Sequence, residues 1–140
     1  MQQRPFELID HTADVGIRAF GPDLPQLFAH AALGMFSLVA DLEKVRDSTP
    51  LEVRLDEDDV EELFHAWLAE LLYHFEVDQI ILSRFEVHEA SETTITATCW
   101  GEPIDLTRHT IRTQIKSVTY HELKVLYSTD GYTAEVLFDI

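Results

Sequence analysis

The chain has 140 residues, a length that suits one domain with its own core, so we treat residues 1–140 as a single domain. Its 26 acidic and 10 basic residues give a net charge of −16, which repels phosphate backbones and disfavours direct nucleic-acid binding. Such a surface attracts basic proteins or divalent cations, although a need for solubility explains it equally well.

The amino-terminal segment and the cysteine content are typical of a cytoplasmic protein. Residues 1–7 hold no apolar run, so we expect neither a signal peptide nor a transmembrane helix, and no membrane contact. Cys99 is the one cysteine, which rules out a disulfide within the chain and suits a reducing compartment.

The first third of the chain predicts two strands and a helix. An opening strand leads to Asp10, and a second strand covers Val15–Phe20, where apolar residues alternate with others. A helix is expected over about Leu24–Val39 because apolar residues recur there at helical spacing. Asp23 is the expected N-cap, and Pro25 falls in the first turn, where its missing N–H costs no hydrogen bond.

The remaining two thirds predict one more helix among short strands. A strand over Leu51–Leu55 precedes a helix over about Asp58–Phe75, whose acidic first turn suits the positive end of the helix dipole. Period-two alternation then predicts further strands, and Asp130-Gly131 indicates a hairpin. We therefore expect an α+β fold in which an antiparallel sheet sandwich is covered by the two amphipathic helices, in the order β-β-α-β-α-β-β-β-β-β.

The loop Asp10-His11-Thr12-Ala13-Asp14 gathers two carboxylates, an imidazole and a hydroxyl between two strands. Asp14 precedes Val15, so its side chain should point away from the core face. Such a loop can present a binding site, but it can equally be an Asx-turn in which Asp10 and Thr12 bond backbone N–H groups.

The carboxyl-terminal residues form a second candidate. Phe138 continues an inward-facing set, so Asp139 should point to the opposite face, and Ile140 adds an α-carboxylate. Hard oxygen donors of this kind suit Ca²⁺ or Mg²⁺. The alternative is an ordinary frayed end in solvent.

Other polar residues have simpler interpretations. Lys116–His121 is either a strand with a solvated face or a surface that contacts a partner. The seven histidines lack the i, i+4 spacing of a helical zinc site, and Cys99 has no cysteine companion, so zinc is not expected. Cys99 lies on the apolar face of a strand and is interpreted as a core residue.

Several motifs are spread over nearly the whole chain: residues 10–16 (DHTADVG), 31–36 (AALGMF), 67–73 (WLAELLY), Gly101-Glu102, Asp105, His109, 115–121 (IKSVTYH) and Asp139-Ile140. In their sequence and order these motifs resemble the archease family. The opening motif and the aspartate-isoleucine ending, taken together, are the specific part of this resemblance.

The resemblance implies a compact α+β sandwich and a role as an accessory protein of an RtcB-type RNA ligase in tRNA splicing and RNA repair. Archeases promote guanylation and multiple turnover of that ligase, so the chain is not expected to be an enzyme. The family's metal ligands correspond here to Asp14, Asp139 and a main-chain or terminal oxygen of Ile140, with calcium as the expected ion and magnesium or manganese as alternatives. A metal-dependent hydrolase, with His11 or His121 as base, and a general chaperone or scaffold are the alternative functions.

Overall fold

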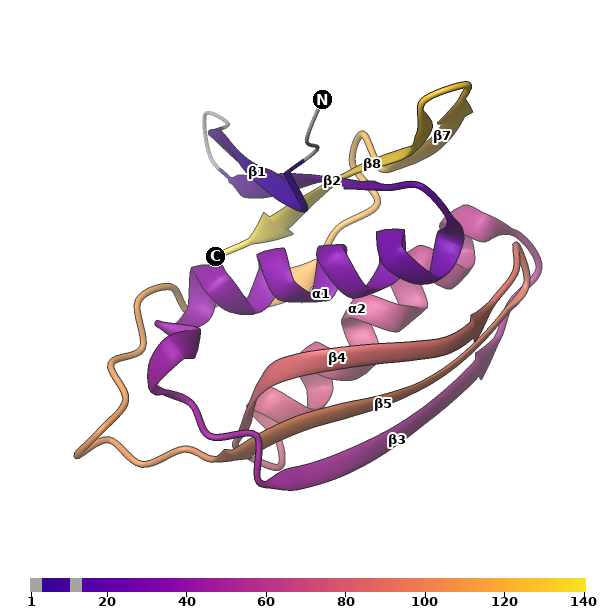
Figure 1. Ribbon diagram of the computed structural model, residues 1–140. Coiled ribbons are helices and arrows are strands. Elements are labelled where there is room, and N and C mark those ends of the chain that lie inside the picture. The colour runs from indigo at the N-terminus through magenta and orange to yellow at the C-terminus, as the bar shows by residue number, and fades with distance from the viewer. Residues whose placement is uncertain (1–3, 11–13) are drawn as a thin grey trace.

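The computed structural model describes residues 4–10 and 14–140 as an α+β fold, the predicted class (Figure 1). The elements are β1 (Phe6–Asp10), β2 (Val15–Gly21), α1 (Leu24–Val39), the 3-10 helix η1 (Leu42–Lys44), β3 (Thr49–Asp56), α2 (Val60–Glu76), β4 (Ile80–Ala90), β5 (Thr94–Pro103), β6 (Ser117–Val118), β7 (Lys124–Ser128) and β8 (Gly131–Asp139). Their order is the one that the hydrophobic pattern predicts, with η1 as an addition.

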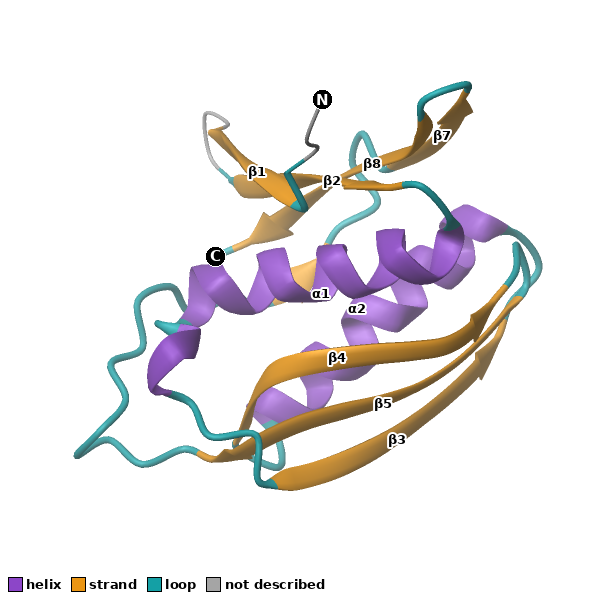
Figure 2. Ribbon diagram, in the orientation of Figure 1, coloured by secondary structure: helices purple, strands orange, loops and turns teal. Residues whose placement is uncertain are grey.

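The strands form two separate antiparallel sheets with the helices between them (Figure 2). The five-stranded sheet has the order β1-β2-β8-β6, and β7 also pairs with β8; the three-stranded sheet has the order β3-β5-β4. Helix α1 packs against β2 of the first sheet and β4 of the second. The helices therefore form a middle layer of the sandwich, because α1 is apolar around much of its circumference and must be covered on two sides.

Each helix begins directly after an aspartate whose side chain caps its first turn. The Asp23 carboxylate accepts the backbone N–H of Gln26 at 2.9 Å, and the Asp59 carboxylate accepts that of Glu62 at 2.9 Å. Helix α2 thus begins at Val60, two residues later than predicted, since Asp59 caps it from outside.

Aromatic rings hold the helices together in the core. Trp67 is fully buried and donates its indole N–H to the Phe28 carbonyl at 2.8 Å, while the two rings meet edge to face at 6.5 Å. Cys99 is also fully buried, and burial raises the pKa of its thiol to about 12, so its interpretation as a core residue is confirmed.

Over residues 4–10 and 14–140, no helix combines the length and the apolar run that a membrane span requires.

Candidate metal site

Strand β8 carries the last residues of the chain into the middle of the five-stranded sheet. It pairs with β2 on one side, where Val15 lies opposite Phe138, and with β6 on the other, where Ser117 lies opposite Asp139. The backbone N–H of Lys116 also donates to the Asp139 carbonyl at 2.7 Å. The strand is therefore paired up to Asp139 and does not fray before it.

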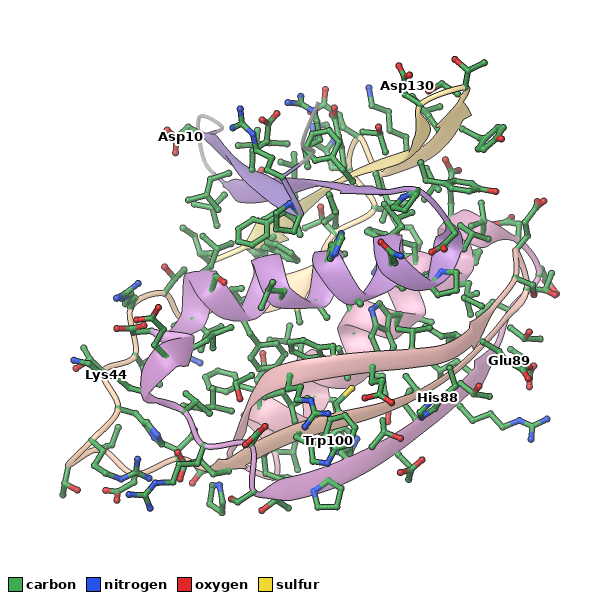
Figure 3. The ribbon with its side chains drawn as sticks, viewed as in Figure 1. Asp10, Lys44, His88, Glu89, Trp100 and Asp130 are labelled. Atoms are coloured by element: carbon green, nitrogen blue, oxygen red, sulfur yellow. The ribbon has the colours of Figure 1, made fainter. Side chains whose placement is uncertain are left out.

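The register brings two of the predicted ligands to one place. Because Val15 lies opposite Phe138, one further step along both strands sets Asp14 across from Asp139. Residues 14 and 139 are far apart in sequence, and the β2–β8 pairing joins them. Asp10, which ends β1 opposite Val15, lies at the same edge of the sheet (Figure 3).

Side-chain alternation directs Asp139 to the outer face of the sheet and predicts the same direction for Asp14, which precedes β2. Val136 and Phe138 are buried toward the helices, whereas Asp139 is exposed and Ile140 is 43% exposed. On that outer face the Arg18 guanidinium already contacts Glu7, and its Nε lies 2.7 Å from Glu135 Oε2. Four residues of strand, about 13 Å, separate Arg18 from Asp14, so this arginine is not placed to neutralise the aspartate pair.

The donor set fits a hard divalent cation. Two carboxylates and a main-chain oxygen of Ile140 are oxygen donors of the type that Ca²⁺, Mg²⁺ and Mn²⁺ prefer. Within the described part of the chain, no group of three or more His, Cys, Asp or Glu side chains could hold a metal. The predicted site combines only two carboxylate side chains with a backbone oxygen, so it does not belong to the class of sites with three or more ligating side chains. The bound metal stays a prediction.

Two other parts of this prediction have different outcomes. His11 and Thr12, in the loop that leads to Asp14, lie outside the described residues. In the Lys116–His121 segment only Ser117–Val118 forms a strand. The Tyr120 ring stacks on the His65 ring, with 3.9 Å between the ring centroids and 8° between the ring planes. A partner-contact role for this segment is untested.

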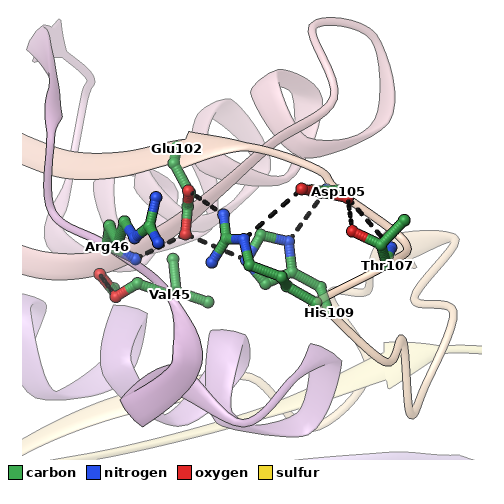
Figure 4. Close-up of polar contacts among 8 residues, drawn as sticks. Val45, Arg46, Glu102, Asp105, Thr107 and His109 are labelled. Carbon is green, nitrogen blue, oxygen red and sulfur yellow. Dashed lines mark hydrogen bonds and ion pairs between the residues drawn. The ribbon is translucent and has the colours of Figure 1, made fainter.

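A second polar cluster, which sequence reasoning did not single out as a site, lies where β5 ends (Figure 4). Glu102 is 6% exposed, and its carboxylate accepts from Arg108 Nη2 at 2.5 Å and from the backbone N–H of Arg46 at 2.7 Å. His109, 4% exposed, places Nε2 3.0 Å from the same carboxylate and accepts the Asp105 N–H at Nδ1. The hydrogen bonds of Arg108 and His109 to Glu102 hold the loop 104–116 against the end of β5.

The charge balance of this cluster keeps Glu102 ionised. The hydrogen bond from Arg108, followed by those from the Arg46 backbone and from His109, lowers the pKa of Glu102 to about 2 despite its burial. Gly101 positions this glutamate, because a Cβ at residue 101 would lie 1.9 Å from the Ile81 carbonyl oxygen. A glycine followed by a glutamate at a strand end was the signal that could have revealed the cluster.

Comparisons with known proteins agree with this fold and with the resemblance in the motifs. Residues 6–140 match the model of the Archease protein family (MTH1598/TM1083). The chain is 41% identical to the protein archease of Methanosarcina barkeri over 99% of this chain and 98% of that one. It is 35% identical to the protein archease of Sulfurisphaera tokodaii over 96% and 98% of the two chains.

Two solved structures are similar over nearly their whole length. The solution structure of Methanobacterium thermoautotrophicum protein 1598 matches with a TM-score of 0.84 and 34% identity, covering 97% of this chain and 99% of that one. A Thermotoga maritima crystal structure, described as an archease and possible chaperone, matches with a TM-score of 0.60 and 18% identity over 100% and 98%, which supports the fold alone.

The fold and the sequence matches define a small α+β protein with two antiparallel sheets enclosing two helices. The chain belongs to the archease family.

Proposed function

We propose that this chain is a metal-binding accessory protein that activates an RtcB-type RNA ligase, promoting ligase guanylation and multiple turnover in tRNA splicing and RNA repair. Membership of the archease family supports the accessory role. The observation that supports the proposal is the β2–β8 register, which pairs Val15 with Phe138, the residues next to Asp14 and Asp139.

In this proposal Asp14, Asp139 and a main-chain oxygen of Ile140 hold one divalent cation, calcium first, with magnesium or manganese as alternatives. The cation neutralises carboxylates that would otherwise repel one another. The sheet supplies the positioning, because β2 and β6 clamp β8 on both sides. The acidic end then docks on the ligase, which performs the chemistry in the cytoplasm, while this chain turns over no substrate of its own.

The test is a ligase guanylation assay with wild type, Asp14→Asn and Asp139→Asn. The matched control is Asp130→Asn, which makes the same change of charge at the opposite end of β8, in the β7–β8 turn (Figure 3). We expect both site variants to lose metal binding and most of the activation, and the control to retain both. Full activation by the two site variants would overturn the proposed role of the metal.

A second candidate function follows from the description of the Thermotoga maritima relative as a possible chaperone. A general chaperone would bind partners without regard to metal, and Asp14→Asn and Asp139→Asn would bind as wild type does. Binding to the ligase that is lost on chelation, and in both variants, favours the ligase-specific role over the general one.

A further inference from the structure

A small cavity opens where the carboxyl end of α1 meets the loop 104–116. Its volume is about 240 Å³, and its charged lining residues are Lys44, Arg108, Arg112 and Asp41, with Ala40, His109 and Thr110 completing the wall. The whole chain has ten lysines and arginines and 26 acidic residues. A cavity lined by three basic side chains and one acidic side chain is therefore unusual for this protein.

Arg108 is held in place by the buried cluster beneath it. Its Nη2 lies 2.5 Å from Glu102 Oε1, and its Nε lies 3.5 Å from Asp105 Oδ2. A guanidinium carries five N–H donors, so these contacts leave further donors for a ligand. Arg108 is thus fixed by a carboxylate that is 6% exposed and still lines the cavity.

The side chains of Arg112 and Lys44 form fewer polar contacts within the described part of the protein than that of Arg108. Arg112 Nη2 lies 3.9 Å from Asp41 Oδ2, which is too long for a hydrogen bond, while its backbone N–H is anchored on the Val39 carbonyl at 2.7 Å. The Lys44 ammonium forms no ion pair with any carboxylate in the described ranges 4–10 and 14–140.

We propose that this cavity binds a phosphate group, either free phosphate or the terminal phosphate of a small ligand such as a nucleoside monophosphate. Arginine forks and a lysine are the donors that recognise phosphate oxygens. The volume lies below the range of about 300–1,000 Å³ typical of larger ligands, which suits a single anionic group. The proposal does not rest on the proposed function.

The cavity and the candidate metal site lie close to each other. Arg112 is anchored at the end of α1, and Lys116 is anchored on Asp139 in β8. Arg112 and Lys116 are four residues apart, so their Cα atoms are separated by at most about 14 Å. The carboxyl ends of α1 and β8 accordingly lie on the same side of the molecule (Figure 1).

A purely structural role for these cations has a distinct consequence. Lys44 and Arg112 lie beyond the carboxyl end of α1, where positive charge stabilises the helix dipole, and Asp41 opposes an incoming anion. Under that role the cations would contribute to stability and the cavity would bind no phosphate. The two roles are separated by measuring binding and stability on the same variants.

The experiment is a ¹⁵N–¹H NMR titration of the full chain with inorganic phosphate, adenosine monophosphate and adenosine, at constant ionic strength set by chloride. We expect saturable shifts at the amides of Lys44 and of residues 108–112 with both phosphate ligands and none with adenosine. Lys44→Gln and Arg112→Gln should each weaken binding about tenfold, since each removes one charged donor. The matched control, Lys124→Gln on β7, should bind as wild type does.

The three ligands also separate the sources of the phosphate. Equal affinity for phosphate and the nucleotide indicates a site for the free anion, and tighter nucleotide binding indicates a site for its terminal phosphate. Equal binding of adenosine and its monophosphate, or no saturable shift at tens of millimolar phosphate, would overturn the proposal. The proposal would also be overturned if Lys44→Gln and Arg112→Gln lowered the thermal stability while the wild type showed no response to phosphate.

Discussion

The carboxylates at the ends of β5 and β8 differ in burial and in the charges around them. Glu102 is buried at the end of β5, and Arg108, His109 and a backbone N–H meet its oxygens. Asp139 is exposed at the end of β8, and the β2–β8 register brings a second carboxylate, Asp14, beside it. One cluster is matched by cations of the same chain, and the other gathers like charge.

Burial and local charge distinguish a carboxylate that maintains the fold from those that we propose bind a ligand. A buried carboxylate with its full set of donors stabilises the structure, and loss of a partner leaves a buried polar group unsatisfied. At the end of β8, by contrast, Asp139 is exposed and contributes little to stability, and the partner proposed for it and for Asp14 is a cation from outside.

Gly101→Ala should have the largest effect. The new Cβ would lie 1.9 Å from the Ile81 carbonyl oxygen and 2.7 Å from the Leu82 Cα, so β4 must move away from β5. We expect a loss of about 3 kcal/mol in the free energy of unfolding, measured by urea denaturation. Gly34→Ala is the control, because its Cβ meets only side-chain atoms of Ile17 and Phe6, at 3.1 Å, and alanine favours the helix. Equal losses in both variants would contradict the proposed tight approach of β5 to β4.

Glu102→Gln should come second, with a loss of about 2 kcal/mol, because the buried His109 and the Arg46 N–H lose a charged acceptor. Glu86→Gln removes an exposed partner of Arg84, 3.4 Å away, and should cost less than about 0.5 kcal/mol. Urea unfolding at neutral pH measures both. A Glu102→Gln variant as stable as wild type would show that the cluster does not fasten the loop.

The contribution of Glu102 should also depend on pH. Its pKa is lowered to about 2 in the folded protein, mainly by the hydrogen bond from Arg108, so the folded state binds its proton less readily than the unfolded chain does. The stabilisation is then complete above the ordinary glutamate pKa of about 4.3 and is lost as the pH falls toward 2. The stability difference between wild type and Glu102→Gln, measured by urea unfolding from pH 7 to 3, should shrink below pH 4. A difference that stays constant with pH would contradict this assignment.

The double variant Asp14→Asn, Asp139→Asn should have the smallest effect. In chelator its unfolding free energy should lie within about 0.5 kcal/mol of wild type, because Asp139 is exposed and substitutions outside the core usually have small effects. With calcium in hundredfold excess over its dissociation constant, wild type should gain about 2.7 kcal/mol and the variant nothing. If chelator-treated wild type were several kcal/mol more stable than the variant, the two clusters would not differ in the way described.

Much of the fold can be predicted from local pattern. Helical spacing and side-chain chemistry identify α1, α2 and the cap Asp23, and alternation identifies the buried face that ends in Phe138. The same pattern places the cap Asp59 inside the second helix. The pairing of strands cannot be predicted in this way, because alternation reports which face of a strand is buried but not its neighbours. The separation into two sheets, with the first two strands joined to the last, depends on tertiary packing.

The two clusters were not equally visible in the sequence. Asp14 and Asp139 are predictable from the family resemblance, and alternation gives their direction, while their proximity needs the β2–β8 register. Glu102, Arg108 and His109 are charged or polar residues at a strand end and in a loop, where solvated side chains are the usual expectation. Their burial follows from the path of the loop 104–116 over the core, which no local pattern encodes.

The most direct test of the proposed metal site is an NMR titration of the full chain with substoichiometric Mn²⁺, whose paramagnetism broadens the signals of nearby amides. We expect the amides of Val15, Gly16, Leu137 and Asp139 to broaden first and the double variant Asp14→Asn, Asp139→Asn to abolish this selectivity. Broadening that begins at the acidic start of α2, around Asp58 and Asp59, or that spreads evenly over the acidic surface, would contradict it.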